Sequence, residues 1–206
     1  EPAGEFFSRA YRQGRLPLWD TTIAGGVNSH ANVTQGQYFP PYVLLLLAGN
    51  SPLLRDIYYL LMLLASGFAC FLLLRRNGFH LISAVFMGSA WMLGGTMAQN
   101  VNAFLGQTYA TLPWLVLAVD LALDKLTWRA LGTAALLVGL CTYSTFLPIV
   151  ISGYVLIGIQ ALVYAGSAVR SPSTRGRLAS VGTLLAFGGV VSLAIGMAAF
   201  FLLPLT

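Results

Sequence analysis

Long apolar runs separated by short polar breaks make up most of the chain after residue 53. Six such runs cover residues 54–74, 79–98, 107–124, 128–145, 147–168 and 178–203. Their lengths are close to the roughly twenty residues that an α-helix needs to cross the hydrocarbon of a bilayer. The pattern therefore predicts an all-α, polytopic membrane bundle of about six transmembrane helices in residues 54–206.

Residues 1–53 follow a different pattern. Apolar residues between positions 6 and 11 recur at spacings of three and four, which predicts a short amphipathic helix that ends at Gly14. Residues 17–41 are rich in Gly, Asn, Thr, Gln and Pro and are too polar to lie in hydrocarbon. Residues 42–49 are apolar but too short to span. We therefore expect an external loop domain with short interfacial or re-entrant helices.

Composition agrees with a membrane protein. The chain has 206 residues, of which 57% are hydrophobic and 8% charged, against about 25% charged in soluble domains. The net charge of +5 comes without a basic patch carrying interleaved aromatic residues, so nucleic acid is not an expected partner. Cys70 and Cys141 lie within apolar runs and are expected to be small packing residues.

The cations predict how the helices are oriented. Seven of them fall in breaks on one side of the expected bundle, and the breaks on the other side carry none; the seven are Arg75, Arg76, Lys125, Arg129, Arg170, Arg175 and Arg177. Because Lys and Arg concentrate in cytoplasmic loops, residues 1–53 are predicted to face the outside or the periplasm. Cations kept on the outer side are then candidates for holding an anionic ligand.

Three arginines and two loop residues are the first candidates for chemistry. Arg9, Arg12 and Arg15 recur every third residue, so a helix would carry them on one broad face. There they would either bind the phosphate of a lipid carrier or extend to ordinary lipid headgroups. Asp20 is the only carboxylate in residues 17–41 and is either a base or hydroxyl contact, or the cap of a turn. His30 would hydrogen-bond a phosphate or a sugar hydroxyl, or lie exposed in the loop. No cofactor is predicted, and metal dependence is left open.

Polar residues also gather at the ends of the third expected span. Amides and aromatic rings suited to sugar hydroxyls, or to an ordinary interfacial belt, lie on its outer side: Gln99, Asn100, Asn102, Gln107, Tyr109 and Trp114. Asp120 and Asp124 close the same span and are expected to be structural anchors that meet Lys125 or Arg129.

The loop also carries a family resemblance. Its order of residues resembles that of the YfhO-like bacterial membrane proteins at Arg15–Asp20, Gly25–Gly26, Ala31–Asn32, Gln35–Gly36 and Tyr38–Pro40. Arg75–Gly78, Leu112–Trp114 and Leu202–Pro204 agree with it as well. Two departures are Asp20, where the family tends to have Asn, and Val27, where it tends to have Pro.

The resemblance implies a GT-C fold and an activity. Such enzymes of the cytoplasmic (inner) membrane move sugar from a polyprenyl-phosphate donor to an extracytoplasmic acceptor, such as a glycan or cell-envelope polymer. Their principal acid usually lies upstream of the Leu-Pro-Leu-Trp segment, so here it is expected before Glu1, in a longer protein of which this chain is an inactive internal fragment. Asp20 is then a possible catalytic contributor. The expected binding residues are Arg9, Arg12, Arg15, Trp19, His30, Gln35, Gln37 and Tyr38.

A different class of protein stays open beside this one. The chain is alternatively a non-enzymatic transporter or flippase component for lipid-linked or envelope polymers. Transporters place polar groups at the midplane of broken or repeated helices. The apolar runs here carry no charge at their centres and no evident repeat, which counts against that alternative.

Overall fold

A computed structural model gives the structure of this chain. It describes residues 2–20, 26–28, 36–95, 97, 104–125, 127–143, 147–169, 182, 185, 187–189, 191 and 192. The described part is mostly helical, as predicted, with one small sheet in addition. His30 and Gln35 lie outside the described residues, as does most of the predicted span 178–203.

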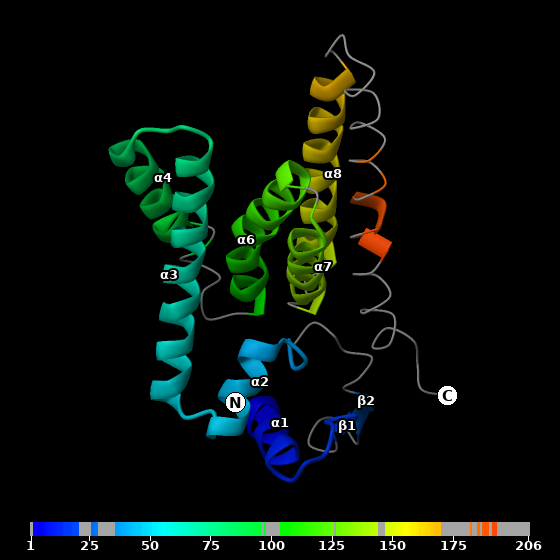
Figure 1. Cartoon of the computed structure of the whole chain (residues 1–206). Helices are drawn as coiled ribbons and strands as arrows, with labels where there is room; N and C mark the ends of the chain where they lie inside the picture. The colour runs from blue at the N-terminus through cyan, green and yellow to red at the C-terminus, as the bar shows by residue number, and fades with distance from the viewer. Residues whose placement is uncertain are drawn as a thin grey trace.

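The helices form three groups (Figure 1). The short helices α1 and α2 lie with the strands β1 and β2 at the lower end of the view. Above them, α3 and α4 form an antiparallel hairpin, and α6, α7 and α8 form a second group of helices. Helix α3 packs against both α4 and α6, so it joins the two groups.

The N-terminal segment begins as the sequence predicts. Helix α1 covers Pro2–Arg12 and ends before Gly14, whose φ of +69° is the left-handed conformation that glycine adopts readily. Arg15 therefore lies beyond the helix, and the expectation of three arginines on one helical face is wrong for it. The two-residue strands β1 (Trp19–Asp20) and β2 (Val27–Asn28) then pair antiparallel, a feature that the all-α prediction missed.

Local capping explains the α2–α3 connection. Helix α2 (Pro40–Ala48) starts with two prolines and ends at Gly49, whose φ of +112° lets its N–H reach the carbonyls of the last turn. Ser51 then caps α3 (Pro52–Arg76), because its hydroxyl accepts a hydrogen bond from the Leu54 N–H at 3.3 Å.

Helices lie in the next four predicted ranges too. They are α4 (Leu81–Leu93), α6 (Phe104–Lys125), α7 (Trp128–Tyr143) and α8 (Leu147–Val169). Gly67 and Gly88 bring α3 and α4 close together, since a Cβ on Gly88 would lie 2.9 Å from the Gly67 carbonyl oxygen. Pro113 lies inside α6 rather than ending it.

Two apolar cores hold these elements. Aromatic and leucine side chains of α1, α2 and α3 form the first: Phe7, Phe39, Tyr42, Leu45, Leu46, Tyr58 and Tyr59. Smaller side chains of α6, α7 and α8 form the second, including Val119, Ala134, Val138, Cys141, Ile157 and Ala161. Helices α1 and α2 therefore pack against the N-terminal end of α3, and this contact holds them beside the bundle.

Much apolar surface remains uncovered. Among the described helices, Pro52–Arg76 and Pro148–Ser167 are long and apolar enough to cross a membrane, with mean hydropathy of 2.3 and 1.9. Only 28% and 33% of these segments are buried within the protein, whereas the core helix of a soluble protein is mostly buried. Ile82 and Phe86 of α4 are likewise 72% and 70% exposed. Helices α4 and α7, with 13 and 16 residues, are shorter than a full span.

Candidate functional site

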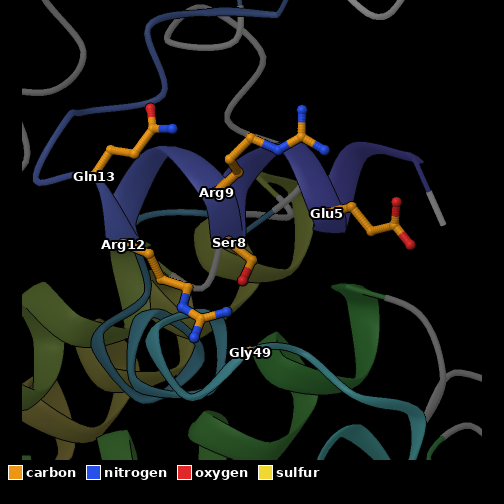
Figure 2. Close-up of a pocket in the computed structure, with 6 residues that line it drawn as sticks. All are labelled: Glu5, Ser8, Arg9, Arg12, Gln13 and Gly49. Atoms are coloured by element: carbon orange, nitrogen blue, oxygen red, sulfur yellow. The ribbon is translucent and has the colours of Figure 1, made fainter.

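A polar pocket of about 370 Å³ lies between α1 and the end of α2 (Figure 2). Its lining residues are Glu5, Ser8, Arg9, Arg12, Gln13 and Gly49. The Ser8 hydroxyl donates to the Leu46 carbonyl at 2.7 Å, which fixes α1 across α2. Two of the three predicted arginines therefore share one pocket.

The two arginines of this pocket have different surroundings. Figure 2 shows Arg12 extending towards Gly49 and Arg9 extending away from it. Arg12 Nη1 comes within 3.9 Å of the position of a Cβ on Gly49, at the C-terminal end of α2. A cation there complements the helix dipole, so Arg12 has a structural role, whereas Arg9 is the side chain free to meet an anion in solution.

The loop residues divide into buried and exposed ones. Gln37 is fully buried, Asp20 is 2% exposed and Tyr38 is 9% exposed. Trp19, by contrast, is 55% exposed. The Tyr11 hydroxyl donates to the Gln37 carbonyl at 2.8 Å and so ties α1 to the loop. Asp20 is engaged by other groups of the protein, which suits a turn-holding carboxylate better than a base facing solvent.

Burial also acts on the phenols at this end. It raises the pKa of Tyr11 well above its ordinary value, with the neighbouring Tyr38 adding to the effect. The pKa of Tyr38 is raised by burial as well. Both hydroxyls therefore stay protonated to a higher pH than an exposed tyrosine does.

An apolar cavity of about 310 Å³ lies between the start of α2 and the helical bundle. Helices α3, α6 and α7 form its walls together with the start of α2, through Phe39, Pro41, Met62, Ala65, Ala110, Thr111, Trp114, Leu137 and Leu140. The only hydroxyl among these side chains, that of Thr111, donates to the Thr108 carbonyl at 2.9 Å. The cavity wall is therefore almost wholly hydrocarbon and suits an aliphatic chain.

Gln107 lies on α6 beside the loop and is 1% exposed. Neither its Nε2 nor its Oε1 has a hydrogen-bond partner among the residues that the structure describes. Gly36, with a φ of +66°, packs directly against it, since a Cβ there would lie 2.8 Å from Oε1. The amide predicted to lie at the outer end of the helix is thus buried under the loop.

A second polar cluster lies at the other end of the bundle, and we call it the Arg76 network. Arg76, at the end of α3, donates to Asp120 through Nε and to Asp124 through Nη2 at 2.8 Å. From α8, the Tyr164 hydroxyl and the Gln160 amide donate to the other Asp120 oxygen at 2.7 and 3.2 Å. The partner of both carboxylates is therefore Arg76, not the predicted Lys125 or Arg129.

Arg15, a metal site and the comparisons with known proteins remain to be considered. Arg15 is exposed and apart from the pocket lining. Within the described residues, no three His, Cys, Asp or Glu side chains gather as metal ligands. No family model, curated protein or solved structure matches the chain, so the resemblance to the YfhO-like proteins stays a prediction.

Proposed function

We propose that this chain belongs to an integral-membrane glycosyltransferase. The enzyme takes sugar from a polyprenyl-phosphate donor and transfers it to an acceptor on the outer face of the cytoplasmic membrane. The observation that carries the proposal is the pair of pockets on α2. An apolar cavity lies at its start, and a pocket with two arginines lies at its end.

The two pockets fit the two parts of a lipid-linked donor. A hydrocarbon-lined cavity binds an isoprenoid chain by removing apolar surface from water. A guanidinium such as that of Arg9 matches the oxygens of a phosphate with paired donors. Helix α2 has nine residues, so at 1.5 Å per residue its two ends lie about 13 Å apart.

The exposed apolar faces of α3 and α8 support a membrane setting, because contiguous apolar surface of this kind needs a covering. The charged side chains of the Arg76 network lie near the C-terminal ends of α3 and α6 rather than at mid-helix, which does not suit a transporter. Proton abstraction from the acceptor needs a carboxylate that faces the substrate. Buried Asp20 does not supply one as it stands.

Filling the apolar cavity tests this proposal. The protein is reconstituted in nanodiscs, and its binding of polyprenyl phosphate is measured. Ala110, 3% exposed in the cavity wall, is changed to Phe. We expect the affinity for polyprenyl phosphate to fall at least tenfold, a loss of about 1.4 kcal/mol.

Two further variants complete the test, one as a control for the added ring and one in the polar pocket. Ala90→Phe adds the same ring on an exposed part of α4 and is expected to leave binding unchanged. Arg9→Ala, in the polar pocket, should weaken binding without lowering the melting temperature. If Ala110→Phe folds and binds polyprenyl phosphate as the wild type does, the cavity is not the chain site and the proposal fails.

A further inference from the structure

The amide of Gln107 is buried at a cost that the fold alone does not explain. The residue is 1% exposed, and both amide atoms lack a hydrogen-bond partner among the described residues. Burying a polar group without a partner is unfavourable, and native proteins keep few such groups. Those they keep are concentrated where a ligand or a reaction uses them.

The neighbours of Gln107 place it at the loop end of the apolar cavity. Ala110 and Thr111 follow it by three and four positions, so they lie on the same face of α6 about one turn further on, and both line the cavity. On the other side, Gly36 packs against the amide. The Phe39 N–H donates to the Gly36 carbonyl at 2.9 Å, and Phe39 itself lines the cavity. The amide is therefore closed to solvent and adjacent to the space for the chain.

We infer that Gln107 is a specificity-determining residue that recognises a hydroxyl-rich head group, the sugar of an amphiphile whose hydrocarbon chain fills the cavity. The inference rests on the proposed function and assigns its sugar recognition to one side chain. An amide offers both a donor and an acceptor, and a hydroxyl satisfies both. A phosphate only accepts, so it would leave the Gln107 Oε1 unpaired.

Replacing Gln107 by Met separates binding from folding. The Met side chain has nearly the same length but no amide to desolvate. Without ligand, Gln107→Met should raise the melting temperature by about 2–4 °C, because the buried unpaired group is gone. With ligand, its affinity for polyprenyl-phosphate glucose in nanodiscs should fall about tenfold, while its affinity for polyprenyl phosphate stays the same.

Gln160→Met is the matched control at the other end of the bundle. The Gln160 Nε2 donates to Asp120 at 3.2 Å, whereas its Oε1, like that of Gln107, has no partner among the described residues. This variant loses a hydrogen bond, so it should not melt above the wild type, and it should bind both lipids as the wild type does. If Gln107→Met melts below the wild type, or keeps the wild-type preference for the sugar-bearing lipid, the inference is overturned and the proposed function stands. If the wild type binds neither lipid, both are overturned.

Discussion

The two ends of the helical bundle handle buried polar groups in opposite ways. At the end away from the loop, the Asp120 carboxylate is 7% exposed and receives hydrogen bonds from Arg76, Gln160 and Tyr164. At the loop end, the Gln107 amide is equally hidden but has no partner among the described residues. Single buried oxygens of Gln160 and Asn50 also lack a partner among the described residues, but Gln107 lacks one for both of its amide atoms.

This difference separates stability from function. The Arg76 network links α3, α6 and α8, which are far apart in the sequence, through hydrogen bonds to Asp120. The loop end combines an open amide with a polar pocket and an apolar cavity. Unsatisfied groups and hollows lower stability, so a protein retains them where a ligand completes the structure. We expect substitutions at the two ends to have different signatures.

The largest effect should come from Arg76→Ala. It removes the cationic partner of the buried Asp120, which keeps only its neutral donors Gln160 and Tyr164. Breaking a buried ion pair costs about 3–5 kcal/mol, and because the Arg76 side chain is 27% exposed we expect a loss at the lower limit of that range. Asp124 contributes less, because its side chain is 54% exposed and solvent screens it. The free energy of unfolding is measured by denaturant titration of the protein in detergent.

Arg75→Ala is the neighbouring control. Arg75 is exposed and donates to the Phe79 carbonyl at 2.9 Å, so its loss should change the free energy of unfolding by no more than about 0.5 kcal/mol. Equal effects of the two variants would show that the network does not stabilise this end.

Apolar runs and helix-stop signals predicted local structure well. The run after Pro52 gave α3, Gly14 ended α1, and the short run before Gly49 became α2. Periodicity carries no information about contacts between distant segments. Arg76 and Asp120 are 44 positions apart, and Gly36 and Gln107 are 71 positions apart, so neither pairing is visible along the chain. Two-residue strands are likewise too short to show alternation.

At the loop end, two glycines with the same backbone conformation isolate the contact with Gln107. Gly14 and Gly36 have φ of +69° and +66°, but only Gly36 faces a neighbour, the Gln107 Oε1. Gly14→Ala should cost about 1–2 kcal/mol for the left-handed backbone. Gly36→Ala should cost about 1 kcal/mol more for the overlap. Adding Gln107→Ala to Gly36→Ala should remove the extra loss in a double-mutant cycle, whereas additive costs would contradict the contact.

The smallest effect concerns the hydrogen bond between α1 and the loop. Tyr11→Phe removes the hydroxyl that donates to the Gln37 carbonyl at 2.8 Å, which should lower the free energy of unfolding by about 1 kcal/mol at pH 7. Hydrogen exchange should quicken in α1 and α2 and stay unchanged around the Arg76 network.

The same variant should also change how stability depends on pH. Burial raises the pKa of Tyr11 in the folded protein, whereas an unfolded tyrosine ionises near pH 10. Above about pH 10 the unfolded chain therefore holds fewer protons than the folded one, and stability falls as pH rises. Tyr38 adds to this slope because its pKa is raised as well. Tyr11→Phe should reduce the slope without abolishing it, as measured by unfolding between pH 8 and about pH 11. An unchanged slope would show that the Tyr11 phenol ionises in the folded protein as it does in the unfolded chain, and that the loop end does not shield it.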